Sequence, residues 1–493
     1  MDDPRNGGTV VVTGMGSSTG AGWLPRAAWS ATAIGLALLA AAAPARAQNA
    51  PADPAETAPP AADPGTAAPP PALVEANPLA ESQLEQVRKA IAAAPRPFEW
   101  HGYLRSGIGV NSKGGAQVAF QAPGAFSKYR LGNETEVYGD FELDANWLNP
   151  EHNDTWFKTA VKLSILAPRN STFDTLSAIA IREGYAEAGH VLASHPEMTF
   201  WAGQRYYRRR DVHIIDFFFN DMSGYGAGFQ DLKIGDSSKL SIAYLGGSVD
   251  PVMGEMPSDV GRFVKNTLDI RLSDIPVGPG NLELWLIPTV EVGGTLPDGT
   301  SPAGMHSGIG GGLFYFTPVM GGFNEISAEA AIGGAANLST SLDRSIADNG
   351  WLARVVERAT IQASPQLSMS WTGVVQLDNR NGAANGSRGN LWISAGARPI
   401  YCFTKYTAIA VEGGVDVVKA EAPAGASVDT GFVGKLTVAP LIRPGMDFWA
   451  RPELRAFVTA AVWNDAVKGA VGGPAFAGDN VGLTAGVQME SWW

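Results

Sequence analysis

Side chains suited to ligand binding are concentrated in one short segment of the chain. Residues 201–217 (WAGQRYYRRRDVHIIDF) combine aromatic rings, arginines and two aspartates. Flat rings can stack on the apolar face of a ligand, arginine offers a planar fork of donors, and carboxylates accept hydrogen bonds. The alternative for Arg208–Arg210 alone is a solvated run of charge. The segment otherwise predicts non-covalent binding.

The residues needed for several other chemistries are missing. Cys402 is the one cysteine, so an internal disulfide and a cysteine-based metal site are excluded. The six histidines stand in no obvious nucleophile motif. This disfavours one possible interpretation, an outer-membrane barrel hydrolase with a Ser/His site. We expect no catalytic residues, no metal and no cofactor. The net charge of -12 argues against a nucleic-acid partner.

The elements that must position these side chains are strands. From Phe98 onward, apolar and polar residues alternate in many segments, as in 453–462 (ELRAFVTAAV). The final segment, 481–493, has one apolar face that ends in Trp493 and one polar face that includes Trp492. Side chains alternate across a strand, so this pattern indicates lipid on one face and water on the other.

A soluble β-sandwich also alternates, but other features favour a membrane barrel. Charged residues are 17% of the chain, below the typical ~25%. No run of 18 apolar residues follows residue 50, which excludes a helical membrane protein. A closed barrel has no sheet edge exposed to lipid. We therefore predict an all-β fold, a transmembrane antiparallel β-barrel.

The N-terminal residues predict export. An apolar run at 31–43 (ATAIGLALLAAAA) follows an arginine and precedes an A-x-A site, which is typical of a signal peptide cleaved after Ala47. We expect residues 1–47 to be this signal. Met15 is the more ordinary start, and residues 1–14 are then an additional leader.

Two further segments precede the strands. Residues 48–78 are rich in alanine and proline and cannot bury a core, so we expect a linker. Residues 79–97 contain apolar side chains at helical spacing and end in prolines. They predict a short amphipathic helix, which as a self-associating arm would form a coiled coil, although two heptads are marginal alone.

Five motifs resemble the maltoporin family of outer-membrane sugar porins. They are WHGYLRSG at 100–107, SKYRLGNE at 127–134, the segment 201–217, WARP at 449–452 and QMESWW at 488–493. The resemblance spans Phe98 to Trp493 and is weak between about 235 and 445. It implies eighteen strands, a homotrimer in outer-membrane lipid, and passive diffusion of di- or oligosaccharides.

The resemblance also gives expected bounds for the barrel, and it extends to the segment that precedes the barrel. It implies a barrel over 98–493 with a constriction loop folded inward at about 205–228. The segment 48–97 resembles the periplasmic coiled-coil arm of sucrose-type members, which leaves the preferred sugar open.

The resemblance implies an aromatic path for the apolar faces of the sugar rings. Its members are Tyr103, Tyr138, Phe173, Phe314, Trp449 and Trp492, of which Phe173 and Phe314 are the weaker matches. Strand parity is an independent test of the other four, because a lumenal aromatic should share its face with polar residues. Tyr103 shares a face with Arg105, and Trp492 shares one with Glu490. In continuous strands, Tyr138 would share a face with Arg130, and Trp449 would share one with Arg451. We therefore expect all four aromatics to point to the polar lumen.

A set of ionic groups for the sugar hydroxyls follows from the same resemblance. It consists of Arg105, Arg130, Arg182, Arg209, Asp211 and Asp216, with Phe218 at the narrowest point. A sugar that exchanges one hydrogen bond for the next along such a track meets only small free-energy barriers, as conduction requires.

The chain departs from the family pattern at two places. Phe218 replaces a tyrosine and so lacks its hydroxyl. Ala119 and Thr135 stand where the family has a first-loop disulfide, so that loop must be held by other contacts. The arginine-rich segment also leaves open an alternative, a less selective porin that prefers small anions.

Overall fold

The computed structural model describes residues 97–134, 136–148, 155–167, 178–247, 263–293, 306–343, 345–380, 382, 389–421 and 428–493. The predicted signal, linker and helical arm lie outside these residues, except for Pro97, and so do Phe173 and Thr135. Among the described residues, no helix combines the length and the hydropathy needed to span a membrane.

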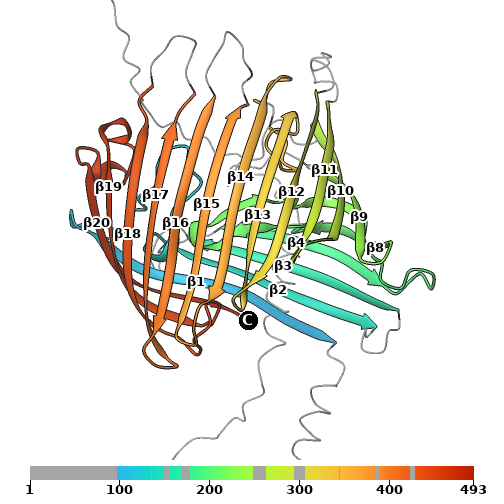
Figure 1. The fold of residues 1–493 in the computed structure, drawn as a ribbon, viewed down its shortest axis with the longest axis horizontal. Coiled ribbons are helices and arrows are strands. Elements are labelled where there is room, and N and C mark those ends of the chain that lie inside the picture. The colour runs from blue at the N-terminus through green and yellow to red at the C-terminus, as the bar shows by residue number, and fades with distance from the viewer. Residues whose placement is uncertain are drawn as a thin grey trace, which may run out of the picture. The chain divides into compact units, whose positions relative to one another are not determined.

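Eighteen antiparallel strands form one sheet, which closes because β1 pairs with both β2 and β20. The predicted eighteen-stranded barrel is confirmed (Figure 1). The strands are β1 (Phe98–Asn111), β2 (Val137–Leu148), β3 (Trp156–Ala167), β4 (Ala178–Gly189), β5 (Thr199–Arg205), β8 (Gly224–Ile234), β9 (Ser238–Gly247), β10 (Phe263–Val277), β11 (Gly280–Gly293), β12 (His306–Val319), β13 (Gly322–Gly333), β14 (Trp351–Gln362), β15 (Leu367–Asn379), β16 (Asn390–Cys402), β17 (Thr407–Lys419), β18 (Gly431–Ile442), β19 (Glu453–Trp463) and β20 (Val481–Trp492).

The alternation read from the sequence sets which side chains face inward. On β19, Leu454 and Val458 are 52% and 50% exposed on the outer wall. Glu453 and Arg455 are 1% and 3% exposed on the inner wall. The barrel is therefore apolar outside and charged inside, the pattern of strands between lipid and water.

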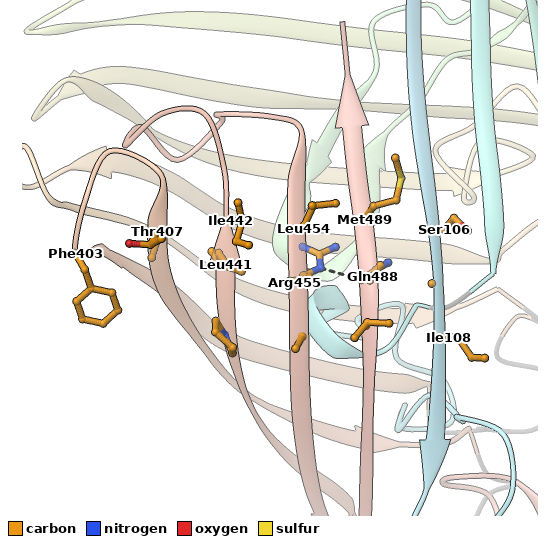
Figure 2. A pocket seen from close by; sticks show the side chains of 15 residues that line it. Ser106, Ile108, Phe403, Thr407, Leu441, Ile442, Leu454, Arg455, Gln488 and Met489 are labelled. Atoms are coloured by element: carbon orange, nitrogen blue, oxygen red, sulfur yellow. Dashed lines mark hydrogen bonds between the residues drawn. The ribbon is translucent and has the colours of Figure 1, made fainter. Parts of the chain in front are cut away.

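An apolar groove on the outer wall shows the same parity at close range (Figure 2). Its outward lining includes Ile108, Leu454 and Met489. Behind it, Arg455 donates from Nε to Oε1 of Gln488 at 2.9 Å on the inner face. Neighbouring positions of one strand thus serve opposite environments.

Connection lengths orient the barrel. Residues 278–279 and 320–321 join strands at the end where β20 finishes, whereas the opposite end carries connections such as 334–350. In bacterial barrels the short turns are periplasmic and the long loops extracellular. The first residues of β1 and the last residues of β2 and β20 therefore lie at the periplasmic end.

The connections after β1 and after β5 fold into the lumen instead of leaving it. The first, 112–136, contains the 3-10 turn η1 (Arg130–Gly132). The second, 206–223, contains β6 (Arg210–Val212), η3 (His213–Ile215) and β7 (Phe217–Asn220). This second segment is the inward-folded constriction loop expected from the sequence.

The assignment of Arg130 and Trp449 to continuous strands is wrong. Tyr129 has φ 49°, a left-handed conformation that ends any extended run, so Arg130 is carried by η1 and not by β2. Trp449 precedes β19 and lies in the connection 443–452. Neither residue can be placed by strand parity.

The first loop is held without a disulfide, and the ring of Tyr129 is one of its contacts with the barrel wall. A Cβ at Gly414 would lie 2.0 Å from this ring, and one at Gly396 would lie 2.1 Å from it. Only glycines leave room for the ring at these two positions. The Tyr129 hydroxyl also lies 2.9 Å from Oγ of Ser394 on β16. This wall of the barrel therefore takes over the role of the missing disulfide.

Candidate functional site

A cavity of about 510 Å³ lies in the lumen beside the constriction loop. It brings together most of the predicted site residues from both ends of the chain. The lining residues are Tyr103, Arg105, Arg130, Tyr138, Asp140, Arg209, Asp211, His213, Asp216, Phe218, Trp449 and Trp492. Residues separated by more than 380 positions in sequence thus share one wall, because β20 closes on β1.

Four aromatic rings form a continuous row along one side of this cavity. Tyr103 lies 6.0 Å from Tyr138 and 6.4 Å from Trp492, measured between ring centroids. Trp492 lies 6.3 Å from Trp449. The β1–β20 register pairs Tyr103 directly with Trp492, and β2 supplies Tyr138 on the other side. Barrel closure thus joins Tyr103 to Trp492, whereas Trp449 comes from the connection before β19.

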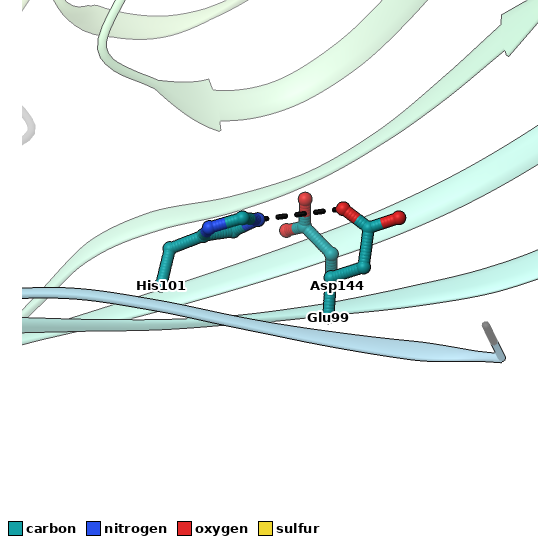
Figure 3. A group of neighbouring side chains, drawn as sticks. All are labelled: Glu99, His101 and Asp144. Atoms are coloured by element: carbon teal, nitrogen blue, oxygen red, sulfur yellow. Dashed lines mark hydrogen bonds and ion pairs between the residues drawn. The ribbon is translucent and has the colours of Figure 1, made fainter. Parts of the chain in front are cut away.

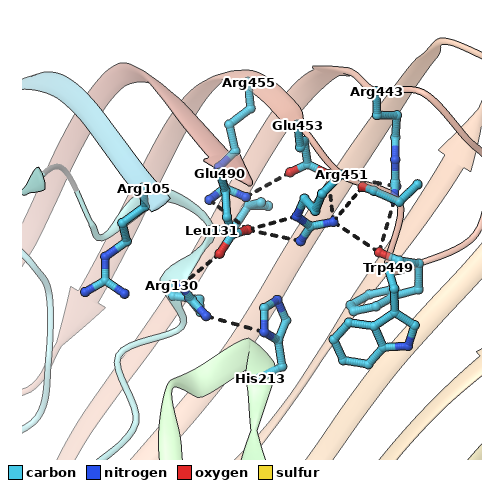
Figure 4. A network of polar contacts seen from close by, with 12 residues as sticks. Arg105, Arg130, Leu131, His213, Arg443, Trp449, Arg451, Glu453, Arg455 and Glu490 are labelled. Atoms are coloured by element: carbon cyan, nitrogen blue, oxygen red, sulfur yellow. Dashed lines mark hydrogen bonds and ion pairs between the residues drawn. The ribbon is translucent and has the colours of Figure 1, made fainter. Parts of the chain in front are cut away.

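Glu490 is the centre of the ionic network behind the row (Figure 4). It is fully buried and accepts hydrogen bonds from the Tyr103 hydroxyl at 2.9 Å and from Nη2 of Arg130 at 2.9 Å. Arg451 donates to its other oxygen from Nε at 3.2 Å and from Nη2 at 3.0 Å. The Arg451 guanidinium also lies 4.1 Å from the ring centre of Trp492. Charge and aromatic ring are therefore held by the same contacts.

The network continues into the first loop through Glu134. Arg130 donates from Nε to Glu134 at 3.0 Å, and Nζ of Lys128 bridges Glu134 and Asp216, each at 2.7 Å. Burial alone would raise the pKa of Glu134, but the nearby cations, Arg130 foremost, lower it to about 2. The carboxylate therefore stays charged, and acids and bases alternate from Glu490 to Asp216.

The three consecutive arginines of the constriction loop point to different partners. Arg208 donates to Oγ of Ser241 at 2.9 Å, whereas Arg210 forms ion pairs with Glu283 and Glu325 on the barrel wall. Their alternative interpretation as a solvated charge run is wrong, because each guanidinium contacts the protein. Two of the three serve to position the loop.

Arg209 is the arginine of this run that faces the cavity. Its guanidinium lies between two rings, 4.0 Å from the centre of Tyr206 and 3.9 Å from that of Phe218. Nε donates to Asp221 at 2.9 Å. Phe218 remains 41% exposed, so the constriction presents a partly exposed ring stacked on a fixed guanidinium.

The opposite wall fixes the backbone of the constriction loop. Arg354 on β14 donates to the carbonyl oxygen of Phe219, and Arg358 donates to that of Asp211 at 2.7 Å. Charge-assisted hydrogen bonds of this kind are stronger than neutral ones. The loop is thereby held as a rigid partition of the lumen.

A second cavity of about 850 Å³ lies toward the extracellular loops and holds Arg182. Tyr138, Arg209, Asp216 and Phe218 line both cavities. The two spaces therefore meet at the constriction and form one route along the lumen. Arg182, from β4, is exposed at the outer part of this route.

Phe314 does not face the route and must be removed from the aromatic row. Its side chain is 1% exposed and packs between Trp285 and Phe219, with centroids 6.0 and 6.5 Å away. The Arg210 guanidinium covers its face at 4.2 Å. The constriction loop folds over Phe314, so the position taken from the family resemblance does not reach the cavity.

Two residues of the narrow cavity were missed as site residues. Asp140 accepts from the Tyr138 hydroxyl at 3.0 Å, and its position two residues after Tyr138 could have identified it by parity. His213 lies 5.2 Å from Trp449 between ring centroids, and its Nδ1 is 3.3 Å from Nη1 of Arg130. Burial and the Arg130 charge hold the pKa of His213 well below its usual value.

A closed barrel with a constriction loop in its lumen defines a porin, a channel of the outer membrane. The sequence model of the LamB porin family matches residues 98–493, and the chain belongs to this family. The family resemblance stated above is thereby confirmed. Family and fold are those of a channel rather than an enzyme.

Two of the solved structures that are similar to the chain at low identity are the outer membrane channel DcaP and OprB. The channel DcaP of Acinetobacter baumannii has 14% identity and a TM-score of 0.42, with 80% of this chain and 97% of that chain covered. OprB of Pseudomonas putida has 8% identity and a TM-score of 0.42, with 84% and 97% covered.

Proposed function

We propose that this porin carries carbohydrates by facilitated passive diffusion. The observation that supports this is the row Tyr138–Tyr103–Trp492–Trp449 opposite ionic groups of the constriction loop in one cavity. A pyranose has apolar C–H faces and a rim of hydroxyls. Aromatic rings suit the faces, and fixed donors and acceptors suit the rim.

Each ionic group of the track has a distinct task in this proposal. Arg209 offers donors from the loop side, and Asp211, whose side chain is 40% exposed, offers acceptors. Arg105 and Arg130 offer donors from the side of the first strand and loop. Because these groups already have partners, a hydroxyl replaces one hydrogen bond with another, and binding stays weak enough for release.

In this proposal Arg182 belongs to the ionic track, on the side of the outer cavity, and Phe173 is a member of the aromatic row. The porin reaches the outer membrane by means of a cleaved signal peptide and assembles as a homotrimer. Size measurement of the detergent-solubilised protein, with and without chemical cross-linking, tests the trimer.

Block of ion current by sugar in planar bilayers tests the main proposal. Maltose, sucrose, cellobiose and maltodextrins should reduce the conductance at micromolar to millimolar concentrations, and liposome swelling with the same panel ranks them. A current that no sugar of the panel reduces would refute carbohydrate selectivity.

The arginines of the outer cavity support a second candidate, an anion-preferring porin. Arg182, Arg209, Arg354 and Arg380 all line this space. Reversal potentials in a KCl gradient distinguish the two candidates. Strong chloride preference together with indifference to sugar favours the second, whereas sugar block favours the first.

A further inference from the structure

Three side chains at the periplasmic mouth lie together outside the two cavities described above. One ligand atom each of Glu99, His101 and Asp144 lies within 4.8 Å of the others (Figure 3). Glu99 and His101 are two residues apart on β1 and so share a face, and the β1–β2 register pairs Glu99 with Asp144. The barrel itself therefore brings one imidazole and two carboxylates together.

Asp144 gives an independent indication of a ligand. The residue is only 4% exposed, yet its Oδ1 has no hydrogen-bond partner in the described part of the chain. Its other oxygen, Oδ2, accepts from Nζ of Lys158 at 3.1 Å. A buried acceptor without a partner is rare in folded proteins, and a bound cation would satisfy it.

The other two ligand side chains, His101 and Glu99, lie close to each other and are exposed enough to change rotamer. Nε2 of His101 lies 3.4 Å from Oε2 of Glu99, and Nδ2 of Asn146 donates to Oε1 of Glu99 at 3.1 Å. The His101 and Glu99 side chains are 48% and 41% exposed, so rotamer changes can shorten the ligand separations. Tetrahedral zinc with bonds of about 2.0–2.2 Å needs ligand atoms roughly 3.3–3.6 Å apart.

Lys158 competes with a metal ion at this site but has a second partner. Its Nζ lies 4.0 Å from Oε2 of Glu187 as well as 3.1 Å from Asp144. A divalent cation at Asp144 would repel the ammonium group toward Glu187, so the lysine keeps a carboxylate partner. We expect this competition to lower the affinity for a cation without preventing binding.

We propose that Glu99, His101 and Asp144 bind a divalent transition-metal ion, for which Zn²⁺ fits the donor set best. Three protein ligands leave a fourth position for water. The ion would join β1 to β2 at the periplasmic mouth. The absence of cysteine pairs suggested no metal site, but these ligands come from two strands separated by a long loop, which spacing in sequence does not reveal.

Titration of the intact, detergent-solubilised porin with Zn²⁺ against a chromogenic chelator tests the site. Wild-type protein should bind one ion per chain, and His101→Ala and Asp144→Asn should each weaken binding at least about tenfold. The matched control is His195→Ala, since exposed His195 is paired, among the described residues, with one carboxylate, Glu197, at 3.6 Å. It should bind as wild type does. Absence of binding to wild type, or unchanged binding to His101→Ala, would overturn the proposal.

Two further measurements do not depend on the folding of those variants. Lys158→Gln removes the competing cation and should tighten Zn²⁺ binding several-fold, so equal or weaker binding counts against the site. X-ray absorption at the zinc edge of wild-type protein should show an imidazole nitrogen among the ligands. A shell of oxygen alone would exclude His101 and overturn the assignment.

Discussion

Tyr103 and Trp492 lie side by side across the β1–β20 pair, with ring centroids 6.4 Å apart and ring planes only 14° from parallel. One residue belongs to the first strand and the other to the last. Their common surface exists only when the two ends of the barrel are joined. Closure of the barrel therefore creates the Tyr103–Trp492 step of the aromatic row.

The first prediction concerns Trp492→Ala. Loss of the central ring of the row should weaken sugar block by about tenfold, or ~1.4 kcal/mol, since stacking surface is lost while the pore stays open. Sugar titration of single-channel current measures this. The control is Trp147→Ala, whose ring is 70% exposed on the outer wall and should not affect block. Equal sugar block in Trp492→Ala and wild type would refute the role of the row.

Tyr103 and Trp492 could be predicted from the sequence because strand parity is local. A lumenal aromatic two residues from a charged side chain is visible in a single strand, as with Trp492 beside Glu490. Arg130 and Trp449 were placed in the lumen for the wrong reason. Loops carry them there, and a loop path depends on contacts such as that of Tyr129 with Gly414, which lie far apart in sequence.

Phe314 marks the limit of that reasoning. It was assigned to the row by the family resemblance, but whether a ring on the inner wall is exposed depends on what fills the lumen beside it. Arg210 of the constriction loop covers it at 4.2 Å. Likewise, the link from Lys128 to Asp216 joins two loops, and no spacing in the sequence indicates it.

The second prediction is that Phe218→Tyr strengthens sugar block. Phe218 is 41% exposed and lines both cavities. The added hydroxyl can therefore contact a sugar at the constriction. One hydrogen bond contributes about 0.5–1.5 kcal/mol, so affinity should rise roughly two- to tenfold. Dose–response curves of current block measure it.

The control for this variant is Phe126→Tyr. Phe126 is 48% exposed and lines the outer cavity but not the narrow one. The affinity of the Phe126→Tyr porin for sugar should therefore stay within about twofold of wild type. If both variants gain equally, the effect arises from general polarity and not from the constriction.

The third prediction concerns the anchor of the first loop. Tyr129→Ala empties the space against Gly396 and Gly414 and should cost about 3–5 kcal/mol of stability, as for other large buried aromatic residues. The loop should also move, which raises current noise. Tyr129→Phe keeps the ring, loses the hydroxyl and with it the contact with Ser394, and should cost about 0.5–1.5 kcal/mol.

Heat-dependent gel mobility gives the stability of each Tyr129 variant, and single-channel recording gives the noise. A quiet, heat-stable Tyr129→Ala protein would show that other contacts, such as that of the Leu131 amide with Glu412 at 2.9 Å, are sufficient to hold the loop.

The last prediction is that acid affects stability through His213 but not sugar block. Its folded-state pKa lies well below the usual value, because the ring is buried and its Nδ1 lies 3.3 Å from Arg130. The charges of Glu490, Arg398 and Arg451 also act on it. His213 should therefore remain neutral between pH 7.5 and 5.5, and block by a neutral sugar should be equal at both values.

Stability should respond differently, because the unfolded chain does take up this proton. With the folded pKa depressed, stability present above pH ~6.5 is lost as the pH falls, by up to ~1.4 kcal/mol per unit. Thermal unfolding of wild type should therefore show a steeper acid decline than that of His213→Gln, whereas His195→Gln, at an exposed turn, should match wild type. Sugar block that weakens at pH 5.5 in wild type but not in His213→Gln would mean that His213 becomes charged in the folded channel.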